Sequence, residues 1–323
     1  MRSENPRSVE VILASPVKPN HPRSYVRPLA VQRGGAGALL SLAFVGEFFR
    51  VLSMGKLYLV LFVMLVLGGA YVVIRNLEKK RQQRRADLLK MRLSPEQREE
   101  LGNDFVLYTR LPEDLRGDLE GLMHVFIEEK IFEPCGGLEE VTPHMQRVIA
   151  AQACILLLRS PHHYYSKLRS ILLYPEAYRA PGQHGAEDVR LGESWGTGSV
   201  VLSWGSVVAG GRNPDDGHDV TIHEFSHQLD QADGAGDGVP ILESNGAYHA
   251  WAAAFKPAFD LFQKRVASGK RTVLDGYGAE NPAEFFAVAT ETFYEKPDQL
   301  KKKYPELYGQ LVSYYGVDPS TWS

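Results

Sequence analysis

The chain has 323 residues, of which 44% are apolar and 23% charged, and its formal net charge is −3 at pH 7. This length allows one large domain or two smaller ones, and the lack of a basic excess argues against a nucleic-acid partner. Two cysteines, Cys135 and Cys154, are too few for a disulfide framework and lack metal-site spacing. Both lie among apolar neighbours, so we expect them in the core.

Residues 1–53 are typical of a disordered leader, because Arg, Pro and Ser recur there with little hydrophobic periodicity. Residues 39–52 are more apolar but are interrupted by Glu47 and Arg50, as in an amphipathic segment. An apolar run begins almost directly after Met54. We therefore interpret Met54 as a candidate for the true start, in which case residues 1–53 are not translated.

Residues 57–74 form an uncharged apolar run of eighteen residues, just long enough to span a bilayer as a helix. A cleaved signal peptide and a buried core helix are the alternatives. A signal peptide would be followed by small residues at a cleavage site, whereas basic residues follow here. We therefore predict a transmembrane anchor at 57–74.

The segment after the apolar run is rich in basic residues, and we expect residues 75–94 to form a charged stalk. The flank before the run offers only Arg50 and Lys56, so the positive-inside rule predicts that the C-terminal side faces the cytoplasm. The expected location is a bacterial inner membrane with the following domain in the cytoplasm, and a cytoplasmic protein is the alternative. The basic residues are Arg75, Lys79, Lys80, Arg81, Arg84 and Arg85.

Helical patterns dominate the next part of the chain. Ser94–Gln97 is a helix start, with a serine cap, proline at the first position and glutamine at the third. Apolar residues recur at helical spacing over 112–130, and Thr142 followed by proline opens another helix that runs to about residue 158. We expect these segments to form a structural helical layer.

Strand patterns follow at 171–174, at 189–191 and, most clearly, at 198–204, which glycine bounds. A strand at 198–204 could form a sheet edge that pairs with an extended peptide, and an internal strand is the alternative. Residues 247–267 then predict a long helix that Pro257 should kink.

The pentapeptide His223 to His227, with Glu224 as its second residue, carries the chemistry of the chain. Histidines four apart lie on one helix face, so both imidazoles can reach one metal ion. Glu224 is offset by one position, which sets it beside the metal to hold and deprotonate the attacking water. This is the zinc-peptidase pattern H-E-x-x-H, and a surface helix that happens to carry two histidines is the alternative.

The surrounding residues favour a helix at this pattern. Asp219 can cap its N-terminus, and the glycine-rich run at 233–238 should end it. Asp230 lies on the ligand face, where it could accept the second N–H of a ligand imidazole or act as an ordinary turn residue. The apolar residues at helical spacing are Ile222, Phe225 and Leu229.

A catalytic zinc needs a third protein ligand and one open position. Asn281 and the proline after it predict a helix start that places Glu284 in the first turn, among apolar residues where a carboxylate is costly to bury unless paired or coordinated. Glu291, two turns on along the same face, is the competing ligand, and we expect Glu280 to be solvated. The histidines to which we assign no metal are His162, His163, His218 and His249.

The segments His223–Asp230 and Tyr277–Glu284 together resemble the Mlc titration factor A family of zinc-dependent peptidases and are similar to the catalytic domain of anthrax lethal factor. The resemblance extends from about residue 111 to 315. It implies one zinc per chain held by His223, His227 and Glu284, with Glu224 as general base and Tyr277 as transition-state stabiliser.

One position departs from the lethal factor pattern. In lethal factor a second glutamate follows the ligand glutamate by four residues, and here Val288 stands at that place. Asp230 and Glu291 are the candidates to replace it around the zinc. We expect an α+β fold: a zincin-like metallopeptidase domain over 95–320 with a helical N-terminal layer, preceded by one transmembrane helix.

The resemblance implies hydrolysis of a peptide or protein substrate, by endopeptidase or aminopeptidase action. The namesake of the family sequesters a transcriptional repressor, so a regulatory binding protein with secondary peptidase activity is the alternative. A structural zinc protein is the third possibility. The intact Glu224 argues against it, because a structural site needs no base and usually closes with a fourth protein ligand.

Overall fold

The computed structural model describes residues 37–159, 164–176, 178–179, 189–190, 192–195 and 198–322. Most of the expected leader, residues 1–36, lies outside this part. The chain divides into two compact units, Met1–Ile74 and Arg75–Ser323.

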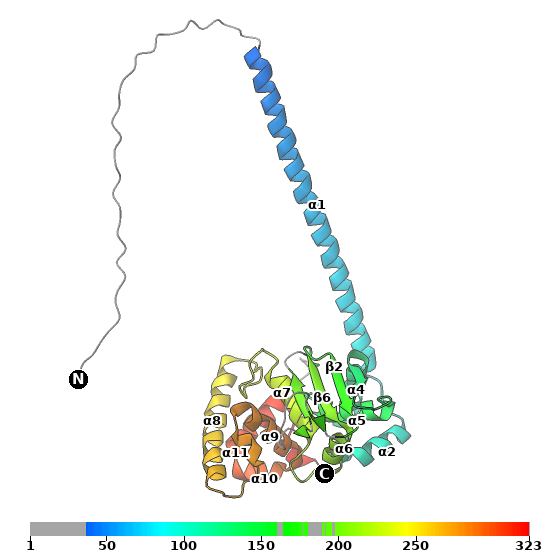
Figure 1. The fold of residues 1–323 in the computed structure, drawn as a ribbon, viewed down its shortest axis with the longest axis vertical. Coiled ribbons are helices and arrows are strands. Elements are labelled where there is room, and N and C mark those ends of the chain that lie inside the picture. Colours follow the sequence, from blue (N-terminus) through cyan, green and yellow to red (C-terminus); the bar gives the residue numbers. More distant parts are fainter. Residues whose placement is uncertain are drawn as a thin grey trace, which may run out of the picture. The chain divides into compact units, whose positions relative to one another are not determined.

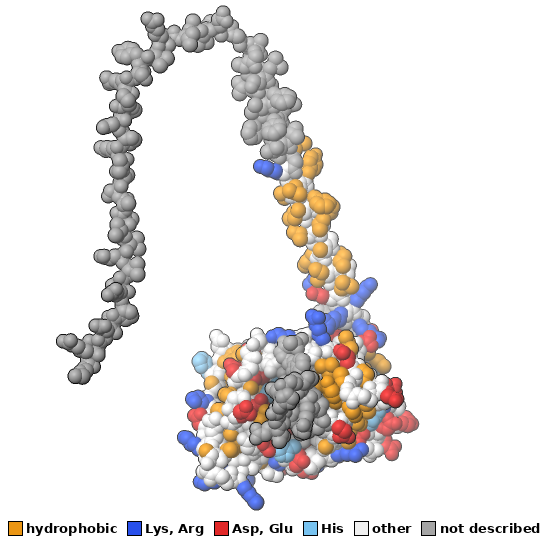
Figure 2. All heavy atoms as spheres, viewed as in Figure 1, with side chains coloured by type: hydrophobic (Ala, Val, Ile, Leu, Met, Phe, Trp, Pro, Cys, Tyr) orange, Lys and Arg blue, Asp and Glu red, His pale blue; other side chains and the backbone are white. Residues whose placement is uncertain are grey.

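The first unit consists, where it is described, of helix α1 (Gly37–Leu88), whose last turns belong to the second unit (Figure 1). Residues 37–53, the last part of the expected leader, lie within this helix. Among the described residues, one helical segment, Tyr58–Leu88, is long and apolar enough to cross a membrane by length and composition. Figure 2 shows its apolar side chains and the basic side chains that follow them.

The second unit is mostly helical. Ser94 caps α2 in the expected capping box, and Thr142 caps α5 by accepting a hydrogen bond from the Met145 backbone amide. The helices at 112–130, 142–158 and 247–267 are confirmed, with Pro257 inside the last of them. The helices before the sheet are α2 (Pro95–Asp104), α3 (Val106–Arg110), α4 (Glu113–Glu129) and α5 (Pro143–Ile155). Those after it are α6 (Trp204–Arg212), α7 (Val220–Asp230), α8 (Asn245–Ala267), α9 (Pro282–Glu295), α10 (Pro297–Lys303) and α11 (Pro305–Tyr315), with 3-10 helices η1 (Gly276–Ala279) and η2 (Pro319–Thr321).

A four-stranded sheet has the order β1-β2-β6-β5. The first three strands are parallel, and β5 pairs antiparallel with β6. The predicted strand at 198–204 is therefore internal, and β5 forms the edge beside it. A two-stranded antiparallel sheet joins β3 (Tyr178–Arg179) to β4 (Val189–Arg190). The four strands are β1 (Ile131–Pro134), β2 (Ser170–Tyr174), β6 (Ser199–Ser203) and β5 (Gly192–Trp195).

Helix α7 has a central place in this unit, because it contacts α5, α9 and strands β5 and β6. Its buried Phe225 packs edge-on against Phe126 of α4 and against Tyr165, with ring centroids 5.6 and 4.9 Å apart. Cys154 is buried and Cys135 is half-buried. The fold is thus α+β, mostly helical with a small, largely parallel sheet.

Part of the basic segment after the apolar run packs on α4. Arg81 and Arg85 each donate two hydrogen bonds to the Glu129 carboxylate at 2.6–3.1 Å. Leu88 and Leu93 at the end of this segment are buried. The ion pairs hold the end of α1 against the C-terminus of α4.

Candidate metal centre

Local sequence sets the rotation of α7. Asp219 caps the helix as expected, because its Oδ1 accepts hydrogen bonds from the backbone amides of Thr221 and Ile222 at 2.9 and 3.0 Å. Burial of Ile222, Phe225 and Leu229 turns the apolar face into the core. The face with His223 and His227 is thereby directed toward α9.

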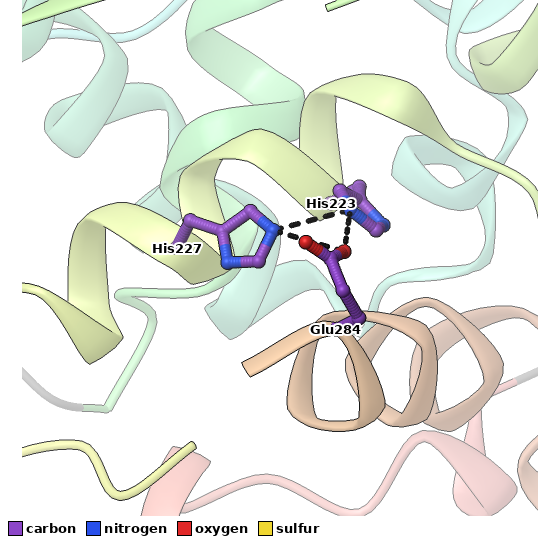
Figure 3. Close-up of side chains that lie close together, drawn as sticks. All are labelled: His223, His227 and Glu284. Carbon is purple, nitrogen blue, oxygen red and sulfur yellow. Dashed lines mark hydrogen bonds and ion pairs between the residues drawn. The ribbon is translucent and has the colours of Figure 1, made fainter. Parts of the chain in front are cut away.

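Helix α9 brings the third side chain. Asn281 caps it by accepting a hydrogen bond from the Glu284 backbone amide at 3.0 Å, which places Glu284 in the first turn. The buried Phe285 and Phe286 fix the rotation of this helix. Figure 3 shows His223 and His227 from one helix and Glu284 from the other, pointing toward one another.

The three side chains form a small triangle. His223 Nε2 lies 3.1 Å from Glu284 Oε2 and 3.2 Å from His227 Nε2, and His227 Nε2 lies 3.3 Å from Glu284 Oε2. Ligands bound to zinc tetrahedrally at about 2.0–2.1 Å are about 3.3 Å apart, so the triangle has the required size. In the described part of the chain this is the single group of three or more such side chains that could hold a metal.

The donor set also fits zinc. Two imidazole nitrogens and one carboxylate oxygen, with no fourth protein ligand among the described residues, are typical of a catalytic zinc centre and not of a structural one. The family of peptidases that the sequence resembles implies the same three ligands.

The Glu284 carboxylate and the imidazole of His223 shift each other's pKa, because each stabilises the charged form of the other. Burial opposes ionisation of Glu284, but hydrogen bonds from His223 and His227 outweigh it and lower its pKa to about 2. Burial also opposes protonation of His223, yet hydrogen bonds to Glu284 and Glu291 raise its pKa to about 10.

Glu291 lies behind His223 and not at the centre of the site. Its Oε1 accepts a hydrogen bond from His223 Nδ1 at 2.7 Å, and its Oε2 accepts one from the Asp219 backbone amide at 2.9 Å. Glu291 therefore orients the His223 imidazole and ties α9 to the start of α7. Asp230 instead accepts a hydrogen bond from the Gly238 backbone amide at 3.0 Å, which fits the turn role.

A second buried carboxylate lies one turn further along α9. Glu295 accepts a hydrogen bond from the His218 backbone amide at 2.9 Å, and burial together with Asp219 and Glu291 raises its pKa well above its usual range. Glu295 is not among the residues that the sequence predicts for the site. Its signal is the spacing of two carboxylates four residues apart on an otherwise apolar helix face.

His218 and His249 do not belong to the triangle. His218 Nε2 lies 3.4 Å from Asp275, and His249 is exposed. His162 and His163 lie outside the described residues. Glu280 is exposed, as expected.

Tyr277 belongs to η1 and lies beside the triangle. Its ring centroid lies 6.0 Å from that of His223, and its side chain is 54% exposed. The adjacent Gly278 allows η1 to approach α9 closely, because a Cβ there would lie 3.2 Å from Val288 Cβ. Val288 thus packs against η1 at the position where lethal factor has a glutamate.

Glu224, between the two histidines on α7, is buried with 6% exposure.

The chain is similar to known proteins over most of its second unit. The family model of the glucose-regulated metallo-peptidase M90 matches residues 78–316. An uncharacterized protein of Synechocystis is 37% identical over 245 residues, covering 73% of this chain and 89% of that protein. Mlc titration factor A of Edwardsiella ictaluri is 31% identical over 230 residues (66% and 84%), and that of Yersinia pestis 28% over 206 residues (60% and 74%).

Proposed function

This chain belongs to the glucose-regulated metallo-peptidase M90 family, and on that premise we propose that it hydrolyses peptide bonds with one zinc ion. The observation that carries the proposal is the triangle of His223, His227 and Glu284, with edges of 3.1–3.3 Å. These three residues would hold the ion. A zinc ion bound there supplies Lewis acidity, which polarises a carbonyl and makes water more acidic.

The chain's own residues supply the proton transfers. Glu224 is the general base: its carboxylate accepts a proton from the attacking water and returns it to the leaving amine. The place of Glu224 on α7 between the two ligand histidines, and its burial, support this role.

Tyr277 is the proposed stabiliser of the transition state. Its proximity to His223 and its location on a short helix tied to α9 support this role. The phenol can donate a hydrogen bond to the oxygen that becomes negative as the carbonyl is attacked. Asp275 Oδ1 caps η1 by accepting a hydrogen bond from the Tyr277 backbone amide at 2.7 Å, which restricts the backbone of this residue.

We further propose that the chain is a membrane protein of the inner membrane, with the peptidase unit in the cytoplasm. The apolar segment that starts at Tyr58 and the basic residues after it support this location.

Metal content and peptide cleavage test the proposed activity. The purified full chain should contain about one zinc and cleave members of a peptide library, and a strong chelator should remove both. Glu224→Gln is the matched control, because it keeps the shape of the side chain and should retain zinc while losing nearly all cleavage. Protein purified without chelator or affinity tag that holds no zinc would contradict the proposal.

Binding of a regulatory protein is the second candidate function. The relatives in Edwardsiella and Yersinia are described as titration factors for Mlc, and this favours a transcriptional repressor as the partner. Binding of this kind does not need a general base. A partner that binds wild type and Glu224→Gln equally, with no peptide cleaved by either, would favour this candidate over the peptidase.

A further inference from the structure

Three cationic side chains surround a cavity of about 280 Å³ between the C-terminal ends of α8 and α10. Arg265 comes from the last turn of α8, Arg271 from the loop that follows, and Lys303 from the end of α10. The polar side chains of Gln299 and Tyr304 also line the cavity. We call this the basic cavity.

The basic cavity has no counter-charge of its own. Within the described part of the chain, no carboxylate lines it and none of the three cations forms an ion pair. Arginines elsewhere in the same unit do pair with carboxylates, as Arg110 does with Asp215 and Arg159 with Asp118. Like charges gathered without a counter-ion repel one another, and a bound anion would remove this cost.

Part of the cavity wall is preorganised. Arg265 Nη2 donates a hydrogen bond to the backbone carbonyl of Arg271 at 3.2 Å, which holds the loop against the end of α8. Tyr304, which also lines the cavity, is buried with 6% exposure. Leu261 is an exposed apolar residue of the same wall.

We propose that the basic cavity binds a phosphomonoester. A phosphomonoester carries a charge of about −1.5 to −2 at pH 7, which matches three cations better than the single charge of a carboxylate does. Guanidinium groups bind phosphate oxygens bidentately, and Lys303 adds a point charge. Leu261 offers an apolar contact to the organic group of the ester.

The basic cavity is connected to the metal centre through a short stretch of chain. Val273 lines the cavity, Leu274 is buried, and Asp275 then caps the 3-10 helix that carries Tyr277. Asp275 also lies 3.4 Å from His218, in the loop that leads into α7. A ligand that holds the loop at 271–273 therefore restricts the segment up to Tyr277.

Calorimetric titration of the full chain in detergent with phenyl phosphate and with inorganic phosphate tests the proposal. We expect one phenyl phosphate per chain, bound more weakly as salt is added. Arg271→Gln and Lys303→Gln should each weaken binding at least about tenfold, because each removes a charge-assisted contact. Lys302→Gln, an exposed lysine of α10 that does not line the cavity, is the matched control and should bind as wild type.

Two further measurements locate the bound ester within the chain. Phosphate can also bind zinc, so the titration is repeated after chelation, and binding that disappears with the metal would overturn the proposal. Hydrogen exchange of residues 271–279 should slow with phenyl phosphate in wild type and in Lys302→Gln, but not in Arg271→Gln. Unchanged affinity in both cavity variants, or tighter binding of an acidic peptide than of either phosphate, would equally contradict it.

A soluble ester and a lipid headgroup present the same phosphomonoester. The full chain is therefore reconstituted in phosphatidylcholine vesicles with and without phosphatidic acid. Phosphatidic acid that blocks phenyl phosphate binding to wild type and to Lys302→Gln assigns the cavity to the lipid. Phenyl phosphate binding that phosphatidic acid leaves unchanged assigns it to a soluble ester.

Discussion

Glu284 and Glu291 lie two turns apart on α9 and contact the same imidazole at its two nitrogens. Glu284 lies 3.1 Å from His223 Nε2, and Glu291 lies 2.7 Å from Nδ1. The two carboxylates therefore have different tasks. Glu284 shares the centre of the triangle with His227, whereas Glu291 fixes the orientation of the ring from outside.

This difference predicts graded losses of zinc. Glu284→Gln replaces an anionic ligand by a poorer neutral one and should lose both zinc and cleavage. Glu291→Gln keeps all three ligands and should weaken zinc binding about 10–100-fold, the usual effect of removing such a partner. Competition with a chromophoric chelator measures both affinities.

Asp230→Asn is the control for these variants, because Asp230 is another buried carboxylate near the site but contacts the Gly238 backbone amide. Its zinc affinity should stay within a few-fold of wild type. If Glu291→Gln strips the zinc while Glu284→Gln keeps it, the ligand assignment is wrong and α9 must present Glu291 to the metal.

Tyr277 permits a prediction about rate alone. Tyr277→Phe keeps the ring beside His223 and removes the phenolic hydroxyl, so zinc content should not change. The loss of one donor to the oxyanion typically costs about 3 kcal/mol, or about a hundredfold in kcat. Steady-state kinetics with one cleaved peptide measures it. A variant with wild-type kcat would remove Tyr277 from the mechanism.

The sequence predicts the three side chains of the triangle, but it does not predict the contacts that other side chains make with them. The spacing of His223 and His227 and the cap at Asn281 are local, so α7, α9 and Glu284 can be predicted from neighbouring residues. The contact from Glu291 to His223 joins residues 68 apart in the chain and depends on how α9 crosses α7. Periodicity placed Glu291 on the ligand face but could not tell a ligand from a supporting group.

At the scale of elements, α4 is the surface on which the end of α1 and the following loop pack. Gly121 of α4 is buried, and a Cβ there would overlap the carbonyl oxygen of Leu89. The absence of a side chain lets the two backbones touch. Arg81 and Arg85 of α1 also form ion pairs with Glu129, which is the last residue of α4.

Gly121→Ala should therefore destabilise the protein. The added methyl group forces the two backbones apart, at a cost of about 1–3 kcal/mol. Gly309→Ala, in α11, is the matched control, because no atom lies within 4 Å of a Cβ there. Alanine is the better helix former, so this variant should gain about 0.5–1 kcal/mol. Urea unfolding of both variants measures the difference, and equal stabilities would show that Leu89 does not pack on α4.

Elements with strong local signals could be predicted, and those defined by long-range contacts could not. Caps and apolar periodicity gave α2, α4, α5 and α8, and the apolar runs gave β2 and β6. Strand β5 is only four residues long and includes glycine and glutamate, so its identity depends on its pairing with β6. The packing of the end of α1 on α4 also depends on contacts of this kind, since the pairs of Arg81 and Arg85 with Glu129 span 48 and 44 residues.

At the scale of the whole molecule, the apolar segment has the surface of a helix that lies in lipid, and we expect the peptidase unit to lie in water. The described side chains from Tyr58 to Ile74 are exposed and almost all apolar, which is costly in water and favourable in lipid. The basic residues begin directly after Ile74, where the second unit starts. Their position predicts that the peptidase unit and the anionic lipids lie on the same side of the membrane.

Membrane topology is therefore the last prediction. The full chain should stay in the membrane fraction after washes with high salt and with alkaline carbonate. A double substitution in the middle of the apolar run, Leu65→Lys with Val66→Lys, should release it, because each charge costs about 2.5–3.5 kcal/mol at the centre of a spanning helix. A green fluorescent protein fused to the C-terminus should fluoresce, and alkaline phosphatase fused there should be inactive. Active phosphatase with a dark fluorescent fusion would reverse the orientation, and wild type in the soluble fraction would show that the segment is not an anchor.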